Sequence, residues 1–211
     1  MSLVKYNNNS ISAISSAGQL ATGSLVPIKT LTASSSSTLS FVDGSDGVVL
    51  DSTYPIYKFE CINIHASSGN DGSNFVFNLS TDGGSNYNVT KTSSAFQTWH
   101  KEDDTGTSLG YNTGNDLAQS TADQSLIFGG LDATNSDGNG CAELYLYNPS
   151  STTFVKHFMG KAVLNSYHPY AWNTYIAGYG NTTNSVDAIR FQLSSGNIDS
   201  GKIKLYGIKD S

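Results

Sequence analysis

The sequence predicts an all-β protein, an antiparallel β-sandwich with a jelly-roll-like arrangement. Short runs of alternating apolar residues recur about every ten to fifteen residues, and clusters of Gly, Asn and Asp separate them. Helix signals are nearly absent, so no βαβ alternation indicates a parallel sheet. Virion and lectin domains of this length often use a jelly roll. An immunoglobulin-like sandwich is the alternative, and no internal repeat indicates a propeller or solenoid.

The expected strands follow from the alternation of apolar and polar residues along each run. Residues 54–65 form the longest run, and its apolar phase changes between Cys61 and Ile62, which predicts a bulge or bend. Residues 115–123 are the only stretch with the pattern of one or two helical turns. The expected strands are residues 26–33, 38–42, 48–50, 54–65, 75–79, 95–100, 124–128, 142–147, 153–159, 174–179, 187–193 and 202–208.

The last of these runs carry the clearest strand signal. Ile189, Phe191 and Leu193 alternate with small or polar residues, and residues 202–208 repeat the alternation after a polar turn. We therefore expect the chain to end inside a sheet and not in a frayed tail.

The composition agrees with a sandwich whose surface is neutral and polar. Charged residues make up only 13% of the chain, while Tyr and Phe number 12 and 9, as suits a two-sheet core. The formal net charge of −6 opposes binding to a phosphate backbone, so no nucleic-acid partner is expected.

Residues 1–24 are expected to form an extended N-terminal arm, followed by a single β-sandwich domain over residues 25–211. The arm is rich in Asn, Ser, Ala and Gly, with apolar residues too sparse for a core and too frequent for a free linker. We expect it to dock on a neighbouring subunit or another protein, the alternative being an arm folded back on its own domain. The residues expected to make this contact are Leu3, Val4, Tyr6, Ile11 and Ile14.

The two cysteines and the terminal segment indicate the cellular setting. Cys61 and Cys141 lie in separate expected strands, where burial as small apolar residues is favoured over a disulfide. No apolar run approaches the length of about 20 residues that a membrane span needs, so no membrane partner is expected. Residues 1–16 lack the charged start and apolar block of a secretory signal. Synthesis in a bacterial cytoplasm fits both absences.

The search for catalytic or metal-binding patterns predicts no enzyme, no cofactor and no metal site. The four histidines are far apart in sequence, and no serine lies in a Gly-x-Ser-x-Gly turn. Residues 132–140 place oxygen side chains at alternate positions, as calcium loops do, but the central glycine is displaced and no bidentate glutamate follows; an Asn/Asp/Gly turn explains the same residues. The carboxylates available for glycosidase chemistry are Glu60, Glu102, Asp103 and Asp104.

One aromatic segment is a candidate glycan or subunit contact. Tyr167, Tyr170 and Trp172 lie close in sequence to Asn173, and exposed rings beside amides stack on sugar rings. The alternative is that these rings pack over a loop or at a subunit contact, where aromatic residues are also enriched.

Three segments carry a resemblance to a known group of proteins. The chain closes with a strand, a Ser-Gly-Asn turn and Gly-Lys-Ile-Lys-Leu-Tyr-Gly-Ile, and it opens with Met-Ser-Leu-Val-Lys-Tyr-Asn-Asn-Asn-Ser. With the segment Ile-Lys-Thr-Leu-Thr-Ala-Ser-Ser-Ser-Ser at residues 28–37, these features resemble small β-sandwich virion proteins of marine tailed bacteriophages, over most of the chain. The resemblance implies a particle component and transfers no functional residues.

The resemblance and the residue patterns together predict a non-enzymatic virion structural protein. A head decoration or cement protein on the capsid surface is favoured, and a tail or fibre adhesin that binds host surface polysaccharide is the alternative. The expected partners are further copies of the chain, with a trimer favoured, other virion proteins such as the major capsid protein and, in the alternative, a host surface glycan. The expected location is the virion surface, with the head favoured over the tail.

Overall fold

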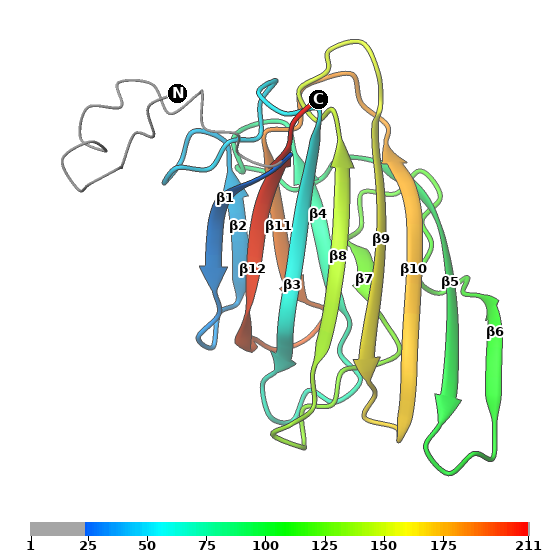
Figure 1. Cartoon of the computed structure of the whole chain (residues 1–211). Coiled ribbons are helices and arrows are strands. Elements are labelled where there is room, and N and C mark those ends of the chain that lie inside the picture. The colour runs from blue at the N-terminus through cyan, green and yellow to red at the C-terminus, as the bar shows by residue number, and fades with distance from the viewer. Residues whose placement is uncertain (1–23, 211) are drawn as a thin grey trace, which may run out of the picture.

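The computed structural model describes residues 24–210, which form two antiparallel sheets packed face to face (Figure 1). The predicted all-β sandwich is confirmed. In chain order the strands are β1 (Leu25–Thr32), β2 (Thr38–Val42), β3 (Ile56–Ala66), β4 (Phe75–Ser80), β5 (Lys91–Lys101), β6 (Thr107–Tyr111), β7 (Gln124–Ile127), β8 (Gly140–Tyr147), β9 (Lys156–Asn165), β10 (Tyr170–Gly180), β11 (Ala188–Leu193) and β12 (Ile198–Ile208).

The pairing of the strands is that of a jelly roll. Four pairs arise as if one long hairpin had been rolled up, namely β1 with β12, β2 with β11, β3 with β8 and β4 with β7. These strands divide into the orders β1-β12-β3-β8 and β2-β11-β4-β7 in the two sheets. β12 lies between β1 and β3, so the last strand is inside a sheet, as the sequence predicted.

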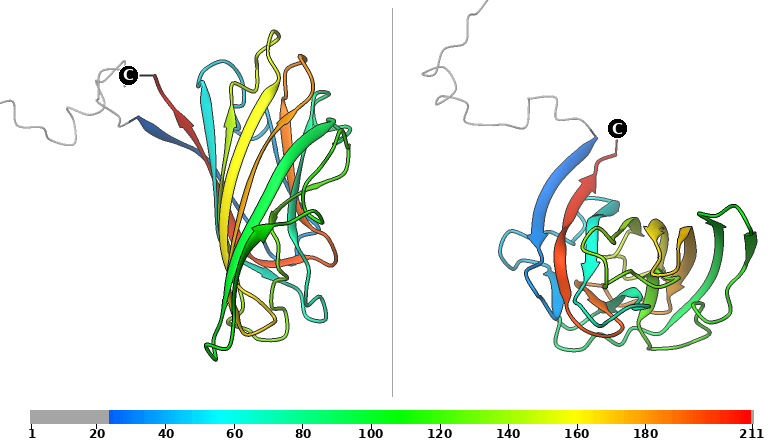
Figure 2. Two further views of the ribbon diagram at one scale, coloured as in Figure 1. Left: turned by 90° about the vertical axis from the view of Figure 1, so that its right-hand side faces the viewer. Right: turned by 90° about the horizontal axis from the view of Figure 1, so that it is seen from below.

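Two further hairpins lengthen only one of the sheets. β5 and β6 follow β4 in sequence, β9 and β10 follow β8, and all four continue the order of the same sheet as β9-β10-β5-β6. The result is a large sheet of eight strands opposite a small sheet of four. β10, β5 and β6 reach beyond β7, the last strand of the small sheet (Figure 1), and β1 and β6 lie at opposite ends of the large sheet (Figure 2).

Phe191 of β11 lies at the centre of the core between the sheets. Its ring centroid is 5.4 Å from that of Phe59, 5.6 Å from that of Phe75, and 6.3 Å from those of Phe41 and Phe77. All five side chains are buried. Because Phe59 belongs to β3 of the large sheet and the other four to the small sheet, these rings join the two layers.

The predicted break in the third strand is a bulge at Asn63. The register of β3 against β8 shifts between Cys61 and Ile64, and Asn63 adopts a positive φ of 53°. Both cysteines are free thiols. Cys61 is 2% exposed and faces the core, whereas Cys141 pairs with Val163 on the opposite side of the sheet, so the two thiols point away from each other.

Three local expectations differ from the structure. Residues 48–50 form no strand, and Val48 and Leu50 enter the core from a loop. Residues 115–123 contain no helix and instead continue along β5, where the backbones of Lys91 and Ser120 exchange two hydrogen bonds. β6 was not predicted, because its short run Thr-Ser-Leu-Gly-Tyr has little apolar alternation. Residues 24–210 contain no helix that is long and apolar enough to cross a membrane.

Lys91 is a fully buried lysine at the start of β5. Its ammonium donates to Asn78 Oδ1 at 2.5 Å and to the Val89 carbonyl at 2.8 Å. Burial lowers the pKa of Lys91 from its ordinary value of 10.5 to about 8, although the Asp123 carboxylate partly opposes this shift. The folded state therefore holds this proton less tightly than the unfolded state.

We expect Phe191→Ala to lower the free energy of unfolding by about 3–5 kcal/mol, because it empties the centre of the inter-sheet core. The control Phe154→Ala removes a ring that is 67% exposed and should change stability by less than about 0.5 kcal/mol. Urea denaturation measures both. Equal losses in the two variants would contradict the central role of Phe191.

We expect Lys91→Met to change how stability depends on pH. Between about pH 8 and 10.5 the unfolded state binds more protons at Lys91 than the folded state, so the native protein should gain stability as pH rises through that range. The variant lacks this gain, so the free energy of unfolding of the native protein should rise relative to that of the variant by up to about 3 kcal/mol. Urea melts of both proteins from pH 7 to 10.5 give the difference, and parallel curves would contradict the pKa assignment.

Candidate functional site

The candidate site is the outer face of the large sheet, defined as the side that faces away from the small sheet. Within residues 24–210, eight large apolar side chains are exposed, and five of them lie on this face. The strand registers place all five on the same side, while their sequence neighbours Phe158, Ala162 and Ile176 face the core. The five are Phe96, Leu109, Tyr111, Met159 and Val163.

One row of paired residues crosses this face and divides it into two halves. From β12 to β6 the direct cross-strand partners are Lys204, Glu60, Glu143, Lys161, Tyr175, Phe96 and Tyr111. The charged half lies on β12, β3, β8 and β9, and the aromatic half lies on β10, β5 and β6. The outer face of β10, β5 and β6 carries no Lys, Arg, Asp or Glu side chain.

The charged half is held together by an ion-pair network around Glu143. Glu60 and Glu143 are direct neighbours and would repel each other, but the Lys58 ammonium lies 2.8 Å from Glu60 and 3.0 Å from Glu143. Lys161 adds a contact of 2.8 Å to Glu143, and the Tyr145 hydroxyl donates to the same carboxylate at 3.0 Å. The Lys161, Lys58 and Tyr145 contacts lower the pKa of Glu143 from 4.5 to about 2.

The aromatic half presents rings that already stack on one another. Phe96 and Tyr175 lie 4.7 Å apart with an interplanar angle of 8°, so each ring covers a face of the other. Their edges and the neighbouring apolar side chains remain exposed.

The face is hollowed along β8, β9 and β10. A hollow of about 380 Å³ and another of about 450 Å³ share Glu143, Lys161 and Tyr175, and a third of about 500 Å³ continues past Met159 and Ala177. These adjoining hollows form a shallow, continuous surface that opens to solvent.

The structure separates the residues of the predicted glycan cluster. Asn173 pairs with Val163 and Thr98 on the outer face, whereas Tyr170 and Trp172 point to the other side of β10. Asn173 therefore does not lie beside the rings that were expected to share a site with it. Tyr167 lies in the loop before β10, and its side chain is 44% exposed.

Tyr170 and Trp172 instead belong to an aromatic cluster on the inner side of β10 and β5, near the end of the sheet. The Trp99 ring is 4.9 Å from Tyr170 and 6.2 Å from Trp172, and His168 links Tyr170 to Tyr167 at 5.6 and 3.9 Å.

Two glycines bring a loop against this cluster. A Cβ at Gly129 would lie 2.6 Å from the Trp172 ring, and one at Gly130 would lie 2.6 Å from Tyr167. Both glycines also have positive φ. The rings of Trp172 and Tyr167 therefore pack over this loop, which is the alternative that the sequence left open.

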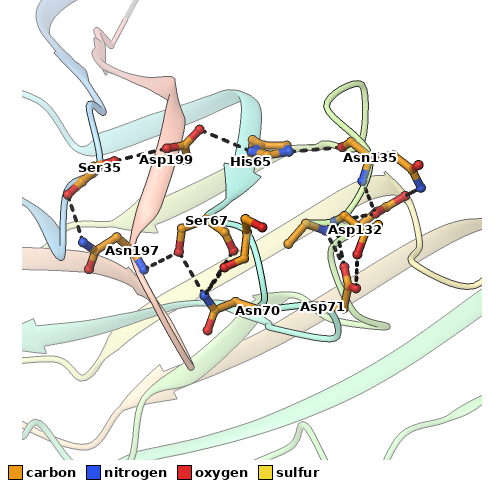
Figure 3. Close-up of polar contacts among 12 residues, drawn as sticks. Ser35, His65, Ser67, Asn70, Asp71, Asp132, Asn135, Asn197 and Asp199 are labelled. Carbon is orange, nitrogen blue, oxygen red and sulfur yellow. Dashed lines mark hydrogen bonds and ion pairs between the residues drawn. The ribbon is translucent and has the colours of Figure 1, made fainter.

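The loop that resembled a calcium site satisfies its own carboxylates. Asp132 accepts from the backbone amides of Thr134 and Asn135 at 3.0 Å and from Asn135 Nδ2 at 2.7 Å. Asp71 accepts from the amides of Ala133 and Thr134 and from the Thr134 hydroxyl (Figure 3). Within residues 24–210, no three His, Cys, Asp or Glu side chains gather as metal ligands. These carboxylates stabilise a turn.

A second set of polar contacts ties this loop to the strands beside it. His65 of β3 lies 3.7 Å from Asp199 of β12 through Nδ1 and 3.3 Å from the Asn135 carbonyl through Nε2. Asp199 also accepts from the Ser35 hydroxyl (Figure 3). Hydrogen bonds and an ion pair therefore hold the connections at this end of the sandwich together.

Glu60 lies far from the other three carboxylates that were considered for glycosidase chemistry. Glu60 is on β3, whereas Glu102, Asp103 and Asp104 are in the exposed β5–β6 connection, and three strands separate β3 from β5. At about 4.8 Å per strand this separation is about 19 Å, beyond the spacing of about 10 Å that such chemistry allows.

The arm residues Leu3, Val4, Tyr6, Ile11 and Ile14 lie outside the described residues. The sequence analysis missed Phe96, Leu109, Met159 and Val163 as surface residues. The alternation in β9 places Met159, Lys161 and Val163 on one side, but only the strand order shows that no second layer covers that side.

Comparisons with family models, with curated proteins and with solved structures return no match.

We expect Glu143→Gln to lower stability by about 1–2 kcal/mol at pH 7, because solvent screens part of the ion-pair energy. Since the folded pKa of Glu143 is about 2, its contribution is present above pH 4.5 and is lost as pH falls toward 2. The gap between native protein and variant should therefore close over that range. Denaturant melts from pH 7 to 2.5 measure it, with the exposed hairpin variant Glu102→Gln as a control that should follow the native curve.

Proposed function

We propose that this chain is a non-enzymatic structural protein of a tailed-bacteriophage virion, a decoration protein that assembles on the capsid surface. The resemblance of its terminal segments to small virion proteins supports the particle assignment. The observation that supports attachment is the concentration of exposed apolar side chains on the outer face of the large sheet. A protein that stays free in solution rarely keeps a contiguous apolar surface of this kind.

The chemistry of the outer face suits a protein partner. Its aromatic half has Phe, Tyr and Leu side chains and no Lys, Arg, Asp or Glu side chain, the composition found at the centre of protein interfaces. The charged half lies beside it as a polar rim. Stacking between Phe96 and Tyr175 covers one face of each ring, so less ring area is left for a sugar, which favours a protein partner over a glycan here.

Glu143 is not suited to act as a general acid. A general acid near neutral pH needs a raised pKa, whereas the ion pairs with Lys161 and Lys58 hold the pKa of Glu143 near 2. This carboxylate thus acts as a fixed anion that organises the surface.

A tail or fibre adhesin that binds host surface polysaccharide is the second candidate. The observation that favours it is the exposed Tyr167 ring, which continues through His168 into the cluster of Trp99, Tyr170 and Trp172. A sugar would stack on Tyr167 without help from Asn173, which lies on the opposite side of β10.

Cryo-electron microscopy of the intact particle tests the assignment. We expect many copies at regular positions on the head lattice, with the outer face of the large sheet against the shell. A few copies at the tail would move the assignment to the adhesin, and binding of host polysaccharide that Tyr167→Ala abolishes would support that candidate. Absence of the chain from purified particles would overturn both.

We expect Phe96→Ala and Met159→Ala each to weaken binding to particles that lack this protein by about tenfold or more, because both remove exposed apolar contacts. The control Phe154→Ala also removes an exposed ring, but from a loop outside this face. Co-sedimentation over a concentration series measures the three affinities. Unchanged binding of the first two variants would show that another surface attaches the protein.

A further inference from the structure

The free edge of the large sheet at β6 is unprotected. β6 is the last strand in the order, and within residues 24–210 no second strand lies along its outer side. The other edge, β1, contains Pro27, a register shift after it and Lys29, features that block pairing with another strand. β6 has none of these, since Thr107–Tyr111 holds no proline and no charged residue.

The hydrogen bonds to β5 determine which backbone groups of β6 point outward. The Asn112 amide donates to the Ala95 carbonyl at 2.9 Å, and the Lys101 amide donates to the Gly106 carbonyl at 3.0 Å. Antiparallel pairing alternates, so the even-numbered Ser108 and Gly110 also direct their amides and carbonyls toward β5. Thr107, Leu109 and Tyr111 direct theirs away from the sheet.

The same three residues carry their side chains on the outer face. Leu109 is 75% exposed and Tyr111 is 57% exposed, and their cross-strand partners are Thr98 and Phe96. The edge is therefore apolar on one side and supplies three outward amides and three outward carbonyls.

We propose that β6 pairs with β6 of a second copy of this chain in antiparallel register about a twofold axis at Leu109. In that register Leu109 faces its own equivalent and Thr107 faces Tyr111, so each outward amide meets an outward carbonyl and about six backbone hydrogen bonds form. The two outer faces then join into one apolar surface across one continuous sheet. The inference does not depend on the particle assignment.

A second copy suits this edge better than an unlike chain. The pattern of outward groups is symmetric about Leu109, so it complements itself, which a twofold contact requires. The chain has a net charge of −6, but Thr107–Tyr111 itself holds no charged residue, so no like-charged side chains of the two β6 strands face each other in this pairing. The nearby Asp116 carboxylate accepts from the Tyr111 hydroxyl at 2.7 Å. The twofold pair that we propose differs from the trimer that the sequence analysis favoured.

Sedimentation equilibrium of the full chain over a concentration series tests the pairing. We expect a monomer–dimer equilibrium that Leu109→Lys and Leu109→Pro each weaken by about tenfold or more, the first by placing two ammonium groups on the axis and the second by removing an outward amide. The matched control is Val163→Lys. Val163 lies on the same face as Leu109 and in the same cross-strand row, which runs through Asn173 and Thr98. Because β10 and β5 separate Val163 from β6, this variant should dimerise like the native protein.

Amide hydrogen exchange locates the contact at single residues. We expect the amides of Thr107, Leu109 and Tyr111 to become protected as concentration rises, while those of Ser108 and Gly110 are protected at every concentration. Fast exchange of all three outward amides in a dimeric sample would overturn the proposal, as would a stable trimer. Dimerisation lost in Val163→Lys but kept in Leu109→Pro would place the contact on the outer face instead. If the outward amides of β6 lose their protection in a variant that starts at Ser24, the N-terminal segment, and not a second β6, covers this edge, and the proposal is wrong.

Discussion

The packing of Phe191 against Phe59 is the contact on which the arrangement of this protein depends. It joins β11 of the small sheet to β3 of the large one, with Phe41, Phe75 and Phe77 around it. A sandwich is stable only if its two apolar faces cover each other. The small sheet has half as many strands as the large one, so it cannot cover the whole inner face of the large sheet. The strands β10, β5 and β6 therefore extend beyond the small sheet (Figure 1).

The surface chemistry follows from that extension. The hairpins β5–β6 and β9–β10 add strands to the large sheet. β10 and β5 carry apolar side chains on both of their faces, and β6 carries them on its outer face. On the inner face Trp99, Tyr170 and Trp172 cover one another beyond the small sheet. On the outer face Phe96 and Tyr175 stack but remain in contact with solvent. The exposed apolar area is thus concentrated on strands added to the roll.

The sequence predicted the strands well because period-2 alternation is a local property. The bulge near Asn63 was predicted for the same reason, since a phase change in the apolar residues is visible along the chain. Pairing is not local. Whether Asn173 shares a face with Trp172, and whether a second layer covers Met159, depends on registers between strands far apart in sequence. The face that we assign to binding therefore could not be predicted from one sequence.

The two halves of the outer face select a partner in different ways. Burying the aromatic half desolvates no Lys, Arg, Asp or Glu side chain of β10, β5 or β6, although His100 also lies on the outer face of β5 and contacts Asp104. Burying the charged half costs little only where the side chains of the network keep their contacts with one another. Lys58 and Lys161 carry two positive charges and Glu143 carries one negative charge, so one positive charge remains, and Glu60 matches it. Lys58 also contacts Glu60, so the network of Lys58, Glu60, Glu143 and Lys161 has no net formal charge. For the protein partner that we propose, apolar area and shape therefore contribute more than charge on this face.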